Sequence, residues 1–103
     1  MTPVGLTAIL DITTWEHISS GHPEVCDPDS VALTLREPNV VQRDPADPSL
    51  LFYYRLAGRR MGRVRDLYMV VIVEDDGDGV GLVKTAYLRR DLMSEGETLW
   101  MKR

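Results

Sequence analysis

Two histidines, His17 and His22, lie close together in the first quarter of the chain. An imidazole gains and loses a proton near neutral pH, so either residue suits general acid or base chemistry. Five positions separate them, which does not place two side chains on one helical face, so a histidine metal pair is not expected. In the absence of a further partner, one histidine is expected to bond a neighbouring loop and the other to be solvated.

Thr85 and Tyr87 form a second polar pair, two positions apart in an apolar stretch. In a strand this spacing places both hydroxyl groups on one face of the sheet, with Lys84 and Ala86 on the other. Such a pair either lines a site or simply occupies a half-exposed sheet face.

Tyr53 and Arg55 share the same spacing in an earlier stretch. An arginine fork there could bind a phosphate through two hydrogen bonds, whereas a cross-strand salt bridge or a solvated side chain is the more frequent outcome. Further arginines follow, and they predict either a solvated loop or a track for phosphate groups. They are Arg59, Arg60, Arg63 and Arg65.

An acidic, glycine-containing segment covers residues 75–79. It lacks the twelve-residue ligand spacing and the terminal glutamate of an EF-hand. Its glycines can supply the positive φ angles of a tight hairpin, so we predict a charged turn rather than a calcium loop. The sequence leads us to expect neither a metal site nor a cofactor.

The first helix is predicted to be short. Thr13 and Glu16 fit a capping box, which places the helix start at Thr13. Gly21 suits the left-handed position that follows a helix, and Pro23 lies just beyond it, so about two turns are expected. Before this helix, the period-two pattern from Val4 to Ile12 favours a short strand.

A second helix is predicted from Asp27, as the N-cap, and Pro28 up to Pro38. An extended segment begins at Val40 and Val41, and the cluster of proline and aspartate at residues 44–49 must end it.

The remaining chain has the pattern of an antiparallel meander. Leu67 to Glu74 is apolar on both faces, as a central strand would be, with Leu50 to Ala57 and Val80 to Leu88 on either side. Trp100 is expected to pack against the core. The pattern therefore predicts an α+β fold, with short N-terminal helices followed by an antiparallel sheet.

The composition is that of one ordinary globular domain covering residues 1–103, with 44% hydrophobic and 27% charged residues. No apolar run approaches the roughly 20 residues that cross a membrane, and the N-terminus lacks the pattern of a secretory signal, so a cytoplasmic protein is expected. Cys26 is the only cysteine, which excludes a disulfide within the chain.

The net charge of −4 is unevenly distributed. Residues 1–50 hold eight acidic side chains against two arginines, whereas residues 51–103 carry ten basic and eight acidic side chains. A local basic patch can attract phosphate, but the overall charge argues mildly against a general nucleic-acid binder.

Short motifs follow one another in a fixed order along the chain. The series is Trp15-Glu16-His17-Ile18, His22-Pro23-Glu24, Thr34-Leu35, Tyr53-Tyr54-Arg55, Val70 to Val73, Thr85-Ala86-Tyr87 and Gly96-Glu97-Thr98-Leu99-Trp100. This series resembles the phage-associated branch of the barnase, EndoU, colicin and RelE-like (BECR) nucleases. The resemblance covers roughly residues 12–100, and the order of the motifs is more specific than any one of them.

The resemblance implies N-terminal helices followed by a four-stranded antiparallel sheet. It also implies metal-independent cleavage of RNA, in which the ribose 2′-hydroxyl attacks the adjacent phosphate. The matching positions give His17, His22, Arg55, Thr85 and Tyr87 as catalytic residues. RNA contacts are expected from Arg59, Arg60 and Arg63.

Such a nuclease would be the toxin of a toxin–antitoxin pair or a phage-derived effector, with RNA as substrate and an antitoxin or immunity protein as partner. Two other classes stay open. One is a protein-interaction module without catalysis, which apolar residues exposed on the first or last strand would favour. The other is a small-molecule binding domain, which would need an enclosed apolar pocket.

Overall fold

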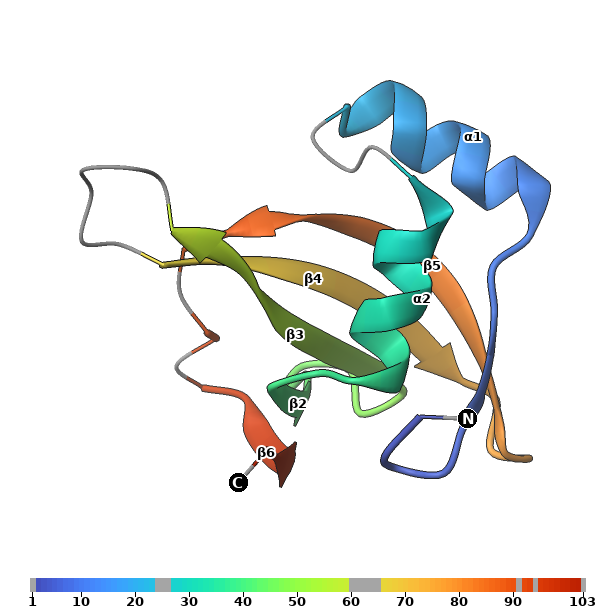
Figure 1. Cartoon of the computed structure of the whole chain (residues 1–103). Helices are drawn as coiled ribbons and strands as arrows, with labels where there is room; N and C mark the ends of the chain where they lie inside the picture. Colours follow the sequence, from blue (N-terminus) through green and yellow to red (C-terminus); the bar gives the residue numbers. More distant parts are fainter. Residues whose placement is uncertain (1, 24–26, 60–65, 91, 94, 103) are drawn as a thin grey trace.

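The computed structural model describes residues 2–23, 27–59, 66–90, 92–93 and 95–102; the side chains of residues 57–59 and 66 are not described. Two helices pack against a six-stranded sheet (Figure 1), so the predicted α+β class is confirmed. The elements are β1 (Thr7–Ile9), α1 (Ile12–Gly21), α2 (Pro28–Arg36), β2 (Val40–Arg43), β3 (Leu50–Arg59), β4 (Asp66–Asp75), β5 (Val80–Arg89) and β6 (Glu97–Met101).

The capping-box pattern predicts that α1 starts at Thr13, but in the structure its N-cap is Asp11. The Asp11 carboxylate accepts a hydrogen bond from the Thr14 backbone N–H at 2.7 Å, which satisfies one of the unpaired donors of the first turn. The helix therefore has ten residues, close to three turns rather than two. Gly21 does not take a left-handed conformation, because the His22 N–H closes the helix onto the Ile18 carbonyl at 2.7 Å.

The second helix begins as predicted. Asp27 is the N-cap of α2, its carboxylate accepts a hydrogen bond from the Ser30 N–H at 2.8 Å, and Pro28 occupies the first helical position. Val31 and Leu35 are buried against the sheet. The helix ends at Arg36, ahead of Pro38.

The strand order of the sheet is β1-β5-β4-β3-β2-β6. The central position of β4, with β3 and β5 antiparallel on either side, is confirmed. The four consecutive strands β2 to β5 are antiparallel, but the sheet does not end with them as a four-stranded sheet would. β6 adds antiparallel to β2, and β1 adds parallel to β5, so the sheet is mixed and six-stranded. These two strands pair edges that would otherwise leave backbone groups without partners.

The sheet has two unlike faces, because successive side chains of a strand point to opposite sides. Both helices cover one face, here the helix-covered face, where residues such as Tyr53, Val71 and Ala86 form the main core with Ile18 of α1. The other, helix-free face carries a smaller core. It consists of Val40, Phe52, Tyr54 and Val70, with Leu92 and Met93 packed against it.

The acidic segment between β4 and β5 forms the predicted hairpin turn. Gly77 and Gly79 have φ angles of 87° and 84°, which only glycine adopts without strain. The Asp76 carboxylate accepts hydrogen bonds from the backbone N–H groups of Asp78 at 2.7 Å and Val80 at 3.2 Å. These carboxylates therefore stabilise the turn from within.

The C-terminal strand is held by its aromatic residue. Trp100 lies opposite Val41 and packs, half-buried, against the main core, which confirms its predicted position. Neither of the two helices in the described part of the chain has the length and apolar character needed to cross a membrane.

Candidate functional site

A histidine and a tyrosine meet at the edge of β5. His22 directly follows α1, which packs on β5, and its ring lies 5.8 Å from that of Tyr87, measured between centroids. β1 pairs with β5 only as far as Leu82, so within the described residues the later part of β5 has no strand on this side. Because no described strand covers this part of β5, His22 at the end of α1 can reach Tyr87.

Two further polar residues of β5 share the face of Tyr87. Thr85 lies opposite Ile72, Tyr87 opposite Val70, and the next residue in this alternation is Arg89. Ile72 and Val70 belong to the core of the helix-free face, so these three polar side chains project there. The prediction that Thr85 and Tyr87 share a face is confirmed.

Tyr54 lies on the same face, on β3, which is separated from β5 by β4. It pairs with Val70, which separates it from Tyr87, and its hydroxyl accepts a hydrogen bond from the Met93 N–H at 3.2 Å. Burial raises the pKa of the Tyr54 hydroxyl, whereas this hydrogen bond and the positive charge of Arg89 act in the opposite direction. Arg89 is therefore close enough to act on the Tyr54 hydroxyl.

The guanidinium group of Arg89 has no hydrogen-bond or ion-pair partner in the part of the chain that is described. It is only partly exposed and lies beside the tyrosine rings. A guanidinium so placed can bind an anionic group. We call the set of His22, Tyr54, Thr85, Tyr87 and Arg89 the β5 site.

Arg55 belongs to the opposite face of the sheet. It pairs with Met69 of the main core, and its Nη1 donates a hydrogen bond to the Glu37 carbonyl at 2.6 Å. This bond satisfies a carbonyl at the end of α2, which the helix itself leaves unpaired. The structure therefore does not bring Arg55 together with Thr85 and Tyr87.

His17 is also not part of the β5 site, and the side chains predicted to contact RNA lie outside the described residues. His17 is exposed on α1, and its backbone carbonyl accepts a hydrogen bond from the Ser20 hydroxyl at 3.2 Å. Arg59 ends β3, but its side chain, like the whole of Arg60 and Arg63, lies outside the described residues. Of the five predicted catalytic residues, the structure brings together His22, Thr85 and Tyr87.

Sequence reasoning missed Arg89 and Tyr54. The signal for Arg89 was present, because the period of two that joins Thr85 to Tyr87 continues to it. Tyr54 follows Tyr53 directly and so faces the other side of the sheet, but the sequence does not say which of the two tyrosines faces β5's polar residues.

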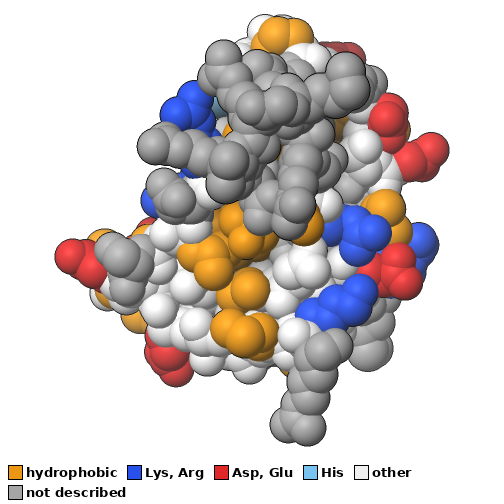
Figure 2. Space-filling model, turned by 60° about the vertical axis from the view of Figure 1, so that its left-hand side comes forward, with side chains coloured by type: hydrophobic (Ala, Val, Ile, Leu, Met, Phe, Trp, Pro, Cys, Tyr) orange, Lys and Arg blue, Asp and Glu red, His pale blue; other side chains and the backbone are white. Residues whose placement is uncertain are grey.

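Charge on the surface is mixed. Figure 2 shows a face on which an apolar area is bordered by Lys and Arg side chains, with acidic side chains further out. Among the described residues, basic side chains lie on both sides of the apolar area.

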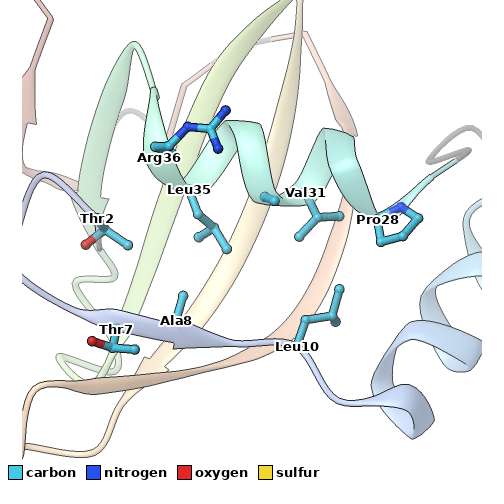
Figure 3. A pocket seen from close by; sticks show the side chains of 9 residues that line it. Thr2, Thr7, Ala8, Leu10, Pro28, Val31, Leu35 and Arg36 are labelled. Carbon is cyan, nitrogen blue, oxygen red and sulfur yellow. The ribbon is translucent and has the colours of Figure 1, made fainter.

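A groove of about 270 Å³ lies on the other side of the molecule's core, between α2 and the N-terminal segment (Figure 3). Val31 and Leu35 of α2 face Ala8 and Leu10 across it, and Arg36 is the one charged residue among the described residues that line it. Pockets for small molecules usually have about 300–1,000 Å³ and enclose most of the ligand. The groove is smaller than such pockets.

The described residues contain no group of three His, Cys, Asp or Glu side chains that could hold a metal ion. Comparison of the chain with models of known protein families, with curated proteins and with solved structures finds no match in any of the three. The β5 site must therefore be interpreted from its own geometry.

Proposed function

We propose that the protein is a metal-independent endoribonuclease that cleaves RNA at the β5 site. The contact between His22 and Tyr87 carries the proposal, because it joins a proton-transfer residue from the N-terminal helices to the polar face of β5. The motif series that resembles BECR nucleases includes both residues and supports the same activity.

The required chemistry is a transfer of the phosphodiester from the 5′-oxygen to the 2′-oxygen of the ribose. A base takes the proton of the 2′-hydroxyl, an acid returns one to the leaving 5′-oxygen, and a cation stabilises the charge that develops on the phosphate. We assign the base to His22, the acid to the Tyr87 hydroxyl and the phosphate contact to Arg89. The products are a 2′,3′-cyclic phosphate and a free 5′-hydroxyl.

Thr85 and Tyr54 surround these three groups. The Thr85 hydroxyl, on the same face two positions before Tyr87, can hydrogen-bond a phosphate oxygen. Tyr54 lies beside them on β3, across Val70 from Tyr87, and is buried. A cell that makes such an enzyme needs an inhibitor for it, so an antitoxin or immunity protein is the partner that this activity calls for.

The first prediction is that RNA is cleaved in the presence of a chelator and that His22→Ala lowers the rate by roughly 100-fold or more. His17→Ala is the matched control, because it removes the other histidine, which is exposed on α1. Its rate should stay near that of the wild type. The assay follows a labelled RNA ladder and tests the products for cyclic phosphate ends.

A second pair of variants tests which face of the sheet carries the reaction. Arg89→Gln should slow cleavage strongly, whereas Arg55→Gln, on the opposite face, should affect thermal stability more than rate. Equal rates for His22→Ala and wild type, or intact RNA across several substrates with a folded sample, would contradict the proposal.

A non-catalytic interaction module is the second candidate, and one observation favours it. Ile9 on β1 is 45% exposed and Met101 on β6 is 58% exposed, so both edge strands present an apolar side chain to solvent. A folded protein that cleaves no RNA but forms a stable complex with a partner would support this candidate.

A further inference from the structure

Part of the helix-free face carries apolar side chains that are exposed to solvent. Ile9 of β1 and Leu82 of β5 lie directly opposite each other, with 45% and 42% of their surfaces exposed. On the same face, Phe52, Tyr54 and Val70 are buried, and Leu92 and Met93 pack against them. Leu92 and Met93 thus cover one half of the face, and the half near the acidic hairpin is open to solvent.

The strand register extends this open area across the sheet. Leu82 pairs with Glu74, and Glu74 pairs with Leu50, so these residues and Ile9 form one row over four strands. Ile72, two positions before Glu74 on β4, adds a half-buried side chain to the same face. We call this set of Ile9, Leu50, Ile72, Glu74 and Leu82 the Ile9 patch.

Single exposed apolar residues are common, but a contiguous group on a flat sheet is a feature of interaction surfaces. A sheet face is usually covered by a second layer, as α1 and α2 cover the other side here. β1 has only three residues, so its edge offers few backbone groups to an added strand. The geometry therefore suits a helix lying on the face better than a strand added to the edge.

The charges around the Ile9 patch are negative. Glu74 lies within the apolar row, and Asp76 and Asp78 follow in the hairpin at its end. One cation, Lys84, is also near; the pKa of the Asp11 carboxyl is lowered chiefly by its hydrogen bond from Thr14 and less by Lys84. RNA would be repelled from such a surface, whereas a positively charged protein segment would be attracted.

Neither described helix of a second copy supplies a basic face. The patch of a second copy carries the same negative charges, α1 contains no Lys or Arg, and α2 contains only Arg36. Symmetric packing of two Ile9 patches would bring the two Glu74 side chains close together across an apolar interface, which is costly.

We infer that the Ile9 patch binds a basic amphipathic helix of a partner protein. The apolar residues of that helix, at positions i, i+3, i+4 and i+7, would cover Ile9 and Leu82, and its Lys or Arg residues would meet Glu74 and the hairpin. The inference concerns a surface that adjoins the β5 site, where Ile72 lies opposite Thr85, and it does not depend on RNA cleavage.

The test is a selection from a library of random 20-residue peptides on the immobilised full-length protein. Peptides that bind should carry a net positive charge and apolar residues at helical spacing. The best peptide, made synthetically, should bind the Leu82→Glu variant at least 10-fold more weakly than the wild type. A selection repeated on Glu74→Lys should no longer enrich basic peptides.

Two controls separate this result from others. Met101→Glu introduces the same charge at an exposed apolar residue on the far edge, and His22→Ala alters the β5 site, so both should bind the peptide like the wild type. Circular dichroism and thermal melting show whether each variant is folded. Selection of acidic or neutral peptides, or binding that survives both Leu82→Glu and Glu74→Lys, would overturn the inference. Wild-type self-association that Leu82→Glu abolishes in sedimentation velocity would also overturn it, in favour of a second copy.

Discussion

Gly81 allows β5 to approach the main core more closely than any other residue would. A Cβ atom at this position would lie 2.4 Å from Val73 Cγ1 and 3.3 Å from Leu6 Cδ1. Real Cβ contacts are not as short as the first of these distances, so the core would have to shift. The absence of a side chain at Gly81 therefore sets the spacing between β5, β4 and the N-terminal segment.

We predict that Gly81→Ala lowers the free energy of unfolding by about 1–3 kcal/mol, the usual cost of overpacking a core. Gly21→Ala is the matched control, because its Cβ meets nothing within 4 Å and its φ is not positive. That change should be neutral or stabilise the helix by up to about 1 kcal/mol. Urea unfolding of both variants is the measurement, and equal midpoints would contradict the prediction.

The residues of the β5 site show what the spacing of residues in the sequence can predict about a site and what it cannot. The period of two predicted that Thr85 and Tyr87 share a face, and it could have predicted Arg89. It could not separate Arg55 from them, because the face on which a residue of β3 lies depends on the register with β4. The contact of His22 with Tyr87 depends in turn on where α1 ends relative to β5, which no local pattern contains.

Among the elements, β6 depends most on a single side chain. It pairs only with β2, and its register with β2 shifts between Val41 and Gln42. Trp100 anchors it by packing against the main core, together with Leu99. Loss of the indole ring should therefore release the strand from the sheet edge.

We predict that Trp100→Ala lowers the free energy of unfolding by about 3 kcal/mol, at the low end for a tryptophan because the ring is only half-buried. Met101→Ala, on the same strand but 58% exposed, should change it by less than about 0.5 kcal/mol. Thermal and urea unfolding of the two variants measure this difference. Similar losses for the two variants would mean that backbone pairing, and not the ring, holds β6.

The sequence predicted most of the long elements and few of the short ones. β3, β4 and β5 were evident because their apolar runs are bounded by turn residues, and α2 because Asp27 and Pro28 mark its start. The start of α1 was misplaced, since Thr13 and Asp11 both have the chemistry of an N-cap. The pairing of β1 with β5 was not predicted, because a three-residue strand carries too little pattern to show its partner.

At the scale of the whole molecule, the two proposed surfaces have opposite charge. Arg89 lies in the β5 site, whereas the Ile9 patch contains Glu74 and borders the acidic hairpin. Both lie on the helix-free face, with Thr85 between Leu82 and Tyr87 along β5. If both proposals hold, this arrangement would let an acidic protein hold RNA at one place and a basic partner at another.

Two buried tyrosines make the stability of the whole domain sensitive to alkaline pH. Burial raises the pKa of Tyr53 and of Tyr54 above the ordinary value for a phenol, and Tyr53 donates a buried hydrogen bond to the Thr2 hydroxyl at 2.8 Å. The unfolded chain therefore releases these protons at about pH 10, before the folded protein does. Their contribution to the free energy of unfolding is fully present below about pH 10 and is lost as the pH rises further.

We predict that the free energy of unfolding falls more steeply above pH 10 in the wild type than in Tyr53→Phe. The variant should be about 1 kcal/mol less stable at pH 8, because it lacks the hydrogen bond to Thr2, and this difference should shrink as the pH rises. Urea unfolding at pH 8 and at about pH 11 measures both effects. The comparison with the variant removes the contribution of exposed Lys84 and Lys102, which is common to both proteins. If the free energies of unfolding of the two proteins fall in parallel with pH, Tyr53 ionises as readily in the folded domain as in the unfolded chain. Burial would then not raise the pKa of Tyr53, and the prediction would be wrong.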